Sequence, residues 1–222
     1  MILNNAENIL IGNQQAEKVY LGTIPIWENL PAEYRKVSYI QSTGTQFLRT
    51  PWEYSIGNPN PPNVKIEITA CNDDNFSIFG ARGTFNLLAT NGEYVLRCYN
   101  SSTSAAINTN IAPSSNMIKW TFDTNTLYAN GSLIGTTTKT SGTGGRLPIL
   151  LFARYDDRIG HPDNDNGGGN CKIAFFKVQQ DSTLVCEMVS CIRKADNIPG
   201  MYDKVTGTFY SNAGTGDFIV PV

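Results

Sequence analysis

Apolar and polar residues alternate with a period of two along much of this chain. Residues 64–70 read Val-Lys-Ile-Glu-Ile-Thr-Ala, so the apolar side chains fall on one face of an extended segment and the polar ones on the other. Residues 118–122 (Ile-Lys-Trp-Thr-Phe) repeat the pattern. Such alternation is typical of antiparallel strands that are buried on one face and solvated on the other. Because helical periodicity is hard to find, the chain is predicted to be β-rich.

Residues 126–135 predict a β-hairpin. Two short strand-like segments flank Asn130-Gly131, a dipeptide that adopts the positive φ angles of a type I′ turn without strain. Further strands are predicted by apolar runs between turn residues, at 75–79, 84–89, 94–99, 148–152, 172–178 and 184–189. Many short strands joined by turns favour an all-β protein, here a two-sheet antiparallel sandwich.

The N-terminal part of the chain differs in pattern from the rest. Short strand-like segments at 9–12, 18–22 and 24–27 predict a small β-module or linker over residues 1–29. The remaining residues, 30–222, are numerous enough for one large sandwich with a full core. The sequence therefore predicts a β-sandwich domain preceded by a short β-module.

Several segments resemble a known family of domains. Residues 30–34 (Leu-Pro-Ala-Glu-Tyr) and 39–47 (Tyr-Ile-Gln-Ser-Thr-Gly-Thr-Gln-Phe) resemble the opening of a domain common in bacteriophage tail and prophage proteins. Residues 200–218 closely resemble the C-terminal signature of that domain. Residues 120–131 resemble the hairpin of laminin-G-like domains, and 18–27 is similar to the short β-module that precedes the domain in phage structural proteins.

This resemblance spans residues 30–222 and implies a concanavalin A-like lectin/glucanase jelly roll. It implies a tail-associated or host-contact protein whose partners are host cell-surface glycans or other virion proteins. The fold alone does not establish sugar binding, because one fold supports several functions. Tail proteins are often trimeric, but no coiled-coil heptads occur here to enforce that state, so a homo-oligomer stays open.

Composition limits the partners further. Only 16% of the residues are charged, and the net charge is −2. No basic cluster is longer than two residues, so we expect no nucleic-acid partner. No window approaches the ~20 apolar residues of a membrane span, and the first residues lack the basic start and apolar core of a signal peptide. We expect no membrane insertion, and a virion (tail) or extracellular location reached without a secretion signal.

The chain contains five cysteines and no C-x-x-C pair. Zinc-ligand spacing is therefore missing, and an odd number cannot form a complete disulfide framework. Cys98 and Cys171 lie in strand-like runs, where a free cysteine behaves as a small buried hydrophobe. The alternative is a disulfide between some of the five.

Catalytic constellations are missing from the sequence. Glucanases of this fold use paired carboxylates spaced as E-x-D-x-x-E, but Glu67 stands alone here with Thr69 in place of the aspartate. His161, the one histidine, lies in a Gly- and Pro-rich loop, which disfavours a Ser-His-Asp arrangement. We therefore predict that the protein is not an enzyme. A divergent glycoside hydrolase is the weakest of the interpretations that stay open.

A sugar site needs an aromatic platform with nearby groups that satisfy hydroxyls. The candidates lie at predicted strand ends or loops: Trp52, Tyr99 and Tyr155, with Asn100 as a hydrogen-bonding partner. The alternative is that these aromatic residues cap the sandwich.

A calcium ion at the rim would need oxygen ligands. The candidate ligands are Asp156, Asp157, Asp163 and Asp165. The run that begins at Asp163 departs from a calcium-binding loop, because Gly167 and Ala174 stand at the fifth and twelfth positions. Calcium is thus compatible with the sequence but not required, and a solvated loop of turn-forming residues is the alternative.

Two functions follow as hypotheses. The first is a non-catalytic carbohydrate-binding or host-surface-recognition domain of a phage or prophage tail protein. The second is a purely structural virion protein whose sandwich only mediates assembly.

Overall fold

The computed structural model describes residues 10–11, 14–16, 18–21, 24–28, 30–55, 62–73, 76–98, 106–138, 145–156, 161–163 and 171–221. These residues form strands, turns and loops, and none of them is helical. Accordingly, the described part of the chain contains no helix with the length and apolarity needed to cross a membrane.

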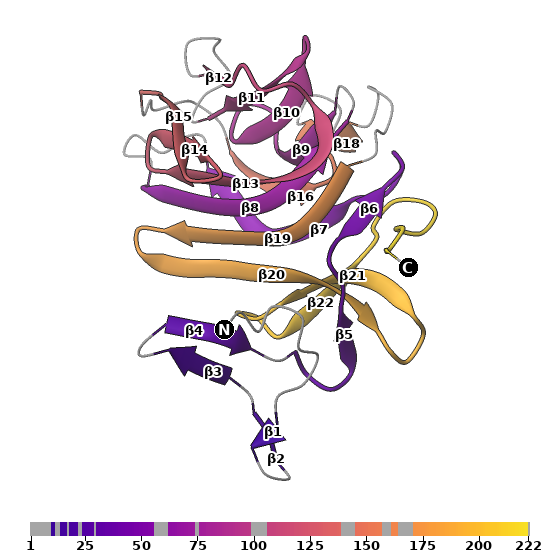
Figure 1. The fold of residues 1–222 in the computed structure, drawn as a ribbon. Coiled ribbons are helices and arrows are strands. Elements are labelled where there is room, and N and C mark those ends of the chain that lie inside the picture. Colours follow the sequence, from indigo (N-terminus) through magenta and orange to yellow (C-terminus); the bar gives the residue numbers. More distant parts are fainter. Residues whose placement is uncertain are drawn as a thin grey trace.

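Two antiparallel sheets make up most of the molecule (Figure 1). The smaller sheet has the order β12-β11-β10-β9-β16-β7. Its strands are β7 (Leu48–Ser55), β9 (Ser77–Gly80), β10 (Asn86–Thr90), β11 (Glu93–Arg97), β12 (Ala106–Asn108) and β16 (Arg146–Leu151). A two-stranded ribbon, β17 (Arg154–Asp156) with β18 (His161–Asp163), follows β16.

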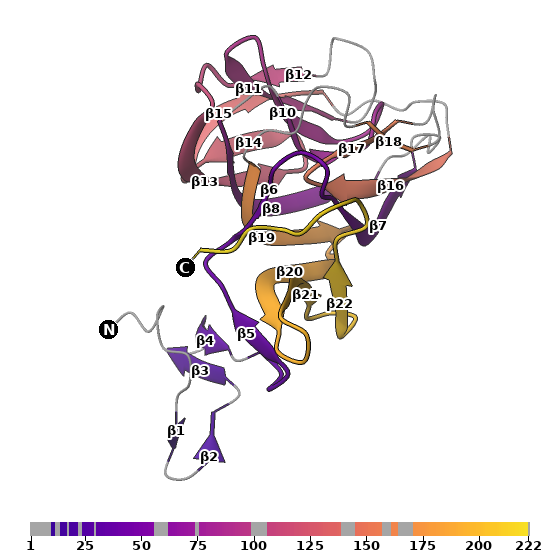
Figure 2. The same cartoon turned by 90° about the vertical axis from the view of Figure 1, so that its right-hand side faces the viewer.

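The larger sheet has the order β15-β14-β13-β8-β19-β20-β21-β22, with β5 paired to β20 and β6 paired to β19. Its strands are β5 (Tyr34–Lys36), β6 (Ile40–Ser42), β8 (Val64–Asn72), β13 (Ser114–Asp123), β14 (Thr126–Ala129), β15 (Ser132–Thr136), β19 (Cys171–Gln180), β20 (Thr183–Arg193), β21 (Ile198–Asp203) and β22 (Thr208–Ser211). In both views the strands β20, β21, β22 and β5 continue this sheet away from the smaller one (Figures 1 and 2).

The main core lies between the two sheets. Along β8 every second residue from Val64 to Ala70 is buried, as the alternation predicts. Aromatic rings fill the centre of the core: the Phe85 ring lies 4.9 Å from that of Tyr54 and 5.6 Å from that of Phe122, between centroids. Tyr54 belongs to the smaller sheet and Phe122 to the larger one, so these rings join the two layers.

Strand β20 is buried on both faces over its second half. Cys186 and Met188 belong to the main core, whereas Val189 and Cys191 pack with Leu30 in a second apolar cluster on the opposite face. Partly buried aromatic residues, Tyr34, Phe175, Tyr202 and Phe209, surround that second cluster. A strand that is buried on both faces carries a nearly continuous apolar run in place of an alternating one. β20 therefore continues to Arg193, beyond the predicted residues 184–189.

The predicted turn at Asn130-Gly131 is confirmed, and a second tight turn of the same kind joins β19 to β20. Asn130 and Gly131, between β14 and β15, have φ angles of 49° and 83°. Asp181 and Ser182, between β19 and β20, have φ angles of 46° and 69°. Positive φ at both central residues is the mark of the type I′ turn, whose twist matches that of the strands it joins.

The opening and closing segments of the predicted domain form one unit, which we call the clasp: residues 41–47 and 212–219. Backbone bonds join them, from Ala213 N to Phe47 O (2.9 Å) and from Thr215 N to Thr45 O (3.2 Å). The Asn212 side chain accepts a third bond from Phe47 N at 3.0 Å. Thus the two halves of the signature, far apart in sequence, hold each other in place.

Asp203 explains another part of the C-terminal signature. This side chain is fully buried, and its carboxylate accepts bonds from the backbone of Glu187, Val205 and Thr206 and from the Thr206 hydroxyl. Gly207 follows with a φ of 69°, in the left-handed region that glycine adopts without strain. The motif at 202–207 therefore builds a turn between β21 and β22.

In the N-terminal part, the predicted short strands are present. β1 (Leu10–Ile11) pairs with β2 (Gln14–Gln15), and β3 (Lys18–Leu21) pairs with β4 (Ile24–Glu28). The division of the chain at residue 30 stays a prediction.

The five cysteines are all buried and none of them forms a disulfide, so the predicted role as small hydrophobes is confirmed and the disulfide alternative is wrong. Burial is the main cause that raises the pKa of the Cys98 and Cys191 thiols to about 12 each. Thiols held neutral in this way are poor nucleophiles, which fits a packing role.

Candidate functional site

Trp52 is not the exposed sugar platform that the sequence predicted. Its side chain is 1% exposed and packs in the main core, where its ring lies 5.6 Å from that of Phe85. Its indole Nε1 donates to Gln180 Oε1 at 3.3 Å. Strand β7 buries every second residue from Leu48 onward, and Trp52 falls on the inward parity. Residues 48–55 are not among the predicted strands, so the sequence prediction places Trp52 at a strand end or loop; within β7 it shares the apolar face with Leu48 and Tyr54.

The other predicted ligand residues have separate outcomes. Tyr99 and Asn100 lie outside the described residues. Tyr155 is half-buried and packs against the main core from β17, so only part of its ring is available. Its backbone oxygen accepts from Arg82 N at 2.7 Å, and this bond ties the loop after β9 to β17.

The predicted calcium ligands are not brought together as a site within the described residues. Asp156 is 1% exposed, and its Oδ2 lies 3.0 Å from Arg82 Nη1, so this carboxylate is committed to an ion pair and is wrong as an open metal ligand. Asp163 lies in β18, and Asp157 and Asp165 lie outside the described residues. In the described part of the chain, no three His, Cys, Asp or Glu side chains are grouped to hold a metal.

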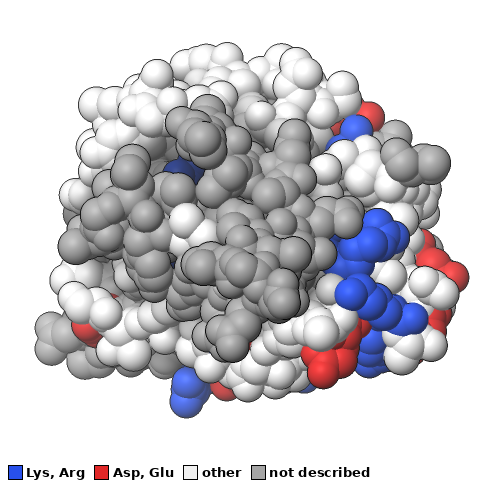
Figure 3. Space-filling view, turned by 60° about the horizontal axis from the view of Figure 1, so that its bottom comes forward, with Lys and Arg blue, Asp and Glu red and all other residues white. Residues whose placement is uncertain are grey.

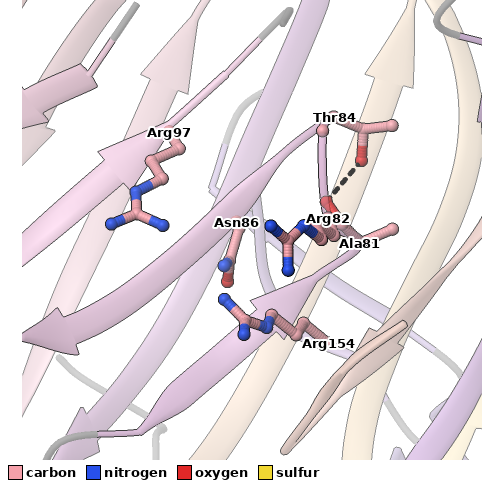
Figure 4. A pocket seen from close by; sticks show the side chains of 7 residues that line it. Ala81, Arg82, Thr84, Asn86, Arg97 and Arg154 are labelled. Carbon is pink, nitrogen blue, oxygen red and sulfur yellow. Dashed lines mark hydrogen bonds between the residues drawn. The ribbon is translucent and has the colours of Figure 1, made fainter. Parts of the chain in front are cut away.

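A pocket of about 290 Å³ lies next to this ion pair. Its lining comes from the loop after β9, from β10, β11 and β17: Ala81, Arg82, Gly83, Thr84, Asn86, Arg97 and Arg154. In Figure 4 the guanidinium groups of Arg82 and Arg154 and the Asn86 amide converge, and Arg97 lies to one side of them on the neighbouring strand. We call this the arginine pocket.

Strand pairing places Asn86 and Arg97 on the floor of the pocket. The two residues are direct cross-strand partners in β10 and β11. Their neighbours Leu87 and Leu96 belong to the main core, so Asn86 and Arg97 share the face of the smaller sheet that points away from the core. The register is fixed by the tight turn between the strands, where Asn91 has a φ of 54°.

The loop after β9 positions Arg82. Gly80 has a φ of 144°, and a Cβ there would overlap the Phe85 carbonyl oxygen and lie 2.6 Å from Asn86 Cα. Only glycine therefore lets β9 approach β10 so closely. The Thr84 hydroxyl then donates to Ala81 O at 2.9 Å and holds the loop in its tight form, as the dashed line in Figure 4 shows.

The polar groups of the pocket are only partly satisfied by one another. Asn86 is 3% exposed, yet its Oδ1 has no hydrogen-bond partner in the structure. Partial burial, and then the guanidinium groups of Arg154 and Arg82, lower the pKa of Arg97. A buried acceptor without a donor costs about 1–3 kcal/mol. One unmet acceptor is therefore buried in the wall of the pocket, beside several strong donors.

Sequence reasoning missed all of the polar lining. The three arginines are isolated in the sequence, and only the fold collects them. One signal was available: the predicted strands 84–89 and 94–99 flank Asn91-Gly92, and a two-residue turn there pairs Asn86 with Arg97. The position of Arg154 carried no such signal.

No protein-family model and no curated protein sequence matches the chain. Solved structures do match. A proposed carbohydrate-binding protein from Bacteroides ovatus ATCC 8483 superposes with a TM-score of 0.53 at 10% identity, over 88% of this chain and 61% of its own. This chain thus spans about three fifths of that protein's length. A heptameric SAP-like pentraxin from Limulus polyphemus matches at 12% identity over 64% of this chain and 73% of its own, and its TM-score of 0.42 is too low to support an argument.

The first match and the observed topology confirm the predicted fold class. The protein is an all-β sandwich of two antiparallel sheets, of the jelly-roll kind. At such low identity the likeness establishes the fold and no more.

Proposed function

We propose that this chain is a non-catalytic carbohydrate-binding protein and that its sugar enters the arginine pocket. The observation that carries the proposal is the Asn86 side chain, which is almost fully buried in the pocket wall with an unpaired acceptor oxygen. Sugar hydroxyls are donors that satisfy such an acceptor, and arginine side chains donate to hydroxyl and ring oxygens in return. The lectin-like fold and the carbohydrate-binding role proposed for the Bacteroides ovatus protein support this assignment.

The non-catalytic part of the proposal rests on the carboxylates. Glycoside hydrolysis uses two of them, about 5–10 Å apart across the scissile bond. Among the described residues that line the pocket there is no acidic side chain. Asp156 lies next to it, but its carboxylate is buried and paired with Arg82, so it is not available as a nucleophile or a general acid.

The biological setting is a proposal from the sequence resemblance. The opening and closing segments resemble a domain of phage and prophage tail proteins, which supports host-surface glycan as the ligand and a virion or extracellular location. The alternative is a structural virion protein that contacts only other virion proteins.

The test is binding to an immobilised glycan panel and to purified host envelope, with calcium and with EDTA. The informative variant is Asn86→Leu, which keeps the branched shape of the side chain and removes the acceptor. We expect it to lose at least about tenfold in affinity, because the lost bond contacts the ligand. Stability should not fall, because Asn86 Oδ1 has no partner in the free protein.

Asn108→Leu is the matched control, because Asn108 is exposed on β12 of the same sheet and does not line the pocket. It should bind like the parent. Failure of the parent protein to bind any glycan or envelope would refute the proposal and favour the assembly role. Binding that survives Asn86→Leu unchanged would place the sugar elsewhere.

A further inference from the structure

Positive charge is concentrated in the arginine pocket at an electrostatic cost. Three guanidinium groups line a space of about 290 Å³. Arg82 is balanced by Asp156, at 3.0 Å. Arg97 is different: no carboxylate among the described residues pairs with it, and its charged neighbours are Arg154 and Arg82. Like charges held close together destabilise the unliganded protein.

The same sheet shows how exposed arginines are otherwise accommodated. Arg49 and Arg146 both lie 3.7 Å from the carboxylate of Glu53, on β7 and β16. On the face of the molecule seen in Figure 3, Lys and Arg side chains likewise lie next to Asp and Glu. The net charge of −2 also excludes a broad basic field. The unbalanced charge is therefore local to the pocket, which is the expected pattern for a site that receives an anion.

We infer that the arginine pocket binds an anionic sugar, with its carboxylate or sulfate held by the Arg97 guanidinium among the neighbouring arginines and a ring hydroxyl donating to Asn86 Oδ1. The inference rests on the proposed function and names its ligand class. Guanidinium forks bind carboxylate and sulfate oxygens with two parallel bonds, so they select for the acid group. A neutral sugar would satisfy Asn86 and leave the charge of Arg97 unmatched.

The size and lining of the pocket fit one acidic sugar residue. Small-molecule sites usually measure about 300–1,000 Å³, so this pocket is at the lower limit and holds a single ring. None of the lining residues in the described part of the chain is aromatic, so these residues provide no ring platform for stacking. Charge and hydrogen bonding supply the affinity instead.

The test uses pairs of glycans that differ in the acid group alone. Suitable pairs are sialyllactose with lactose, oligogalacturonate with its methyl ester, and sulfated with unsulfated lactose. Titration calorimetry should give affinity at least about tenfold higher for the acidic member of a pair. The carboxylate pairs and the sulfate pair separate the two acid groups. Added salt should weaken the binding, because the interaction is ionic.

Arg97→Gln separates a ligand-binding role from a structural one. Binding of the acidic glycan should fall at least about tenfold, while the thermal midpoint should stay the same or rise, because the change removes repulsion from Arg154 and Arg82. Arg146→Gln is the matched control: it also removes one positive charge from the smaller sheet, but outside the pocket. It should bind like the parent.

Asn86→Asp gives a second readout. This nearly isosteric change places a carboxylate among the guanidinium groups, where it acts as a built-in anion. We expect a higher thermal midpoint near neutral pH and loss of acidic-glycan binding. A lower midpoint together with intact binding would overturn the assignment.

The outcomes distinguish this inference from the proposed function. Equal affinity for both members of every pair would overturn the anionic ligand and leave carbohydrate binding in place. Binding of inorganic sulfate without any acidic glycan would overturn the sugar and mark the pocket as a site for simple anions. Absence of binding to every glycan and to sulfate would refute both.

Discussion

The clasp predicts a large effect from a small substitution, Gly214→Ala. A Cβ at this position would overlap the backbone carbonyl oxygen of Thr45 and lie 3.1 Å from Phe47 Cδ1. The overlapping atom belongs to the backbone, so a side-chain rotation cannot relieve the clash. The loop at 212–216 must move away from residues 45–47, and its bonds to them must lengthen or break.

The magnitude follows from those bonds. Four hydrogen bonds cross the clasp around Gly214: two between backbone groups, one from Phe47 N to Asn212 Oδ1, and one from Thr45 Oγ1 to Thr215 O. Each is worth about 0.5–1.5 kcal/mol. Partial loss therefore costs about 2–4 kcal/mol, a large part of the roughly 5–15 kcal/mol that stabilises a typical domain. For a chain of this size the thermal midpoint should fall by about 5–15 °C.

The assay is thermal and urea unfolding of the parent and the variant, followed by near-ultraviolet circular dichroism. Gly145→Ala is the control, because a Cβ there meets no atom within 4 Å and no positive φ is involved. The control should unfold within about 1 °C of the parent, as substitutions away from packed features usually do. If Gly214→Ala also unfolds within about 1 °C of the parent, the clasp contributes no stability. The idea that the signature residues serve to stabilise the fold is then refuted.

Two further predictions concern the core. Trp52→Ala should lower the free energy of unfolding, measured in urea, by about 3–5 kcal/mol. The glycan affinity of the folded molecules should stay unchanged, because Trp52 does not line the pocket. A loss of affinity without a loss of stability would restore Trp52 as a ligand platform. The free energy of unfolding should also decline in alkali. The pKa values of the Cys98 and Cys191 thiols are raised to about 12 in the folded chain, from 9.0 in the unfolded chain. Their contribution to stability is therefore complete below pH 9.0 and is lost as the pH rises toward 12. Urea midpoints measured from pH 7 upward should begin to fall near pH 9, and a constant midpoint would contradict the burial of these thiols.

Much of the fold could be predicted from the sequence because its strands obey local rules. The alternation in β8 and the Asn130-Gly131 turn each fix geometry through neighbouring residues alone. The strand order could not be predicted in this way. In the larger sheet β8 pairs with β19, and that pairing depends on contacts between residues about a hundred positions apart.

The binding site was harder to predict than the fold, for two physical reasons. Residues 48–55 are not predicted as a strand, so the sequence places Trp52 at a strand end, although Leu48, Trp52 and Tyr54 share the apolar face of β7. The arginine pocket forms because β17, which carries Arg154, lies against the loop that carries Arg82. The hydrogen bond from Arg82 N to Tyr155 O joins these two segments, which are far apart in sequence. The sequence pointed to Tyr155 and Asp156 as ligands. In the structure they support the pocket, and the neighbouring Arg154 lines it.

The separation of the clasp from the pocket has a consequence for what the family resemblance can predict. The signature residues at 39–47 and 200–218 serve to close the sandwich, because the side chains of Asp203 and Asn212 accept hydrogen bonds from backbone groups. The residues that line the pocket belong to neither segment. A change of ligand therefore requires no change in the signature, and a chain that keeps the signature can lose Arg97 without a structural cost. Under the proposed function, the ligand class of this chain depends on residues at the outer face of the smaller sheet, and the signature predicts the fold that holds them.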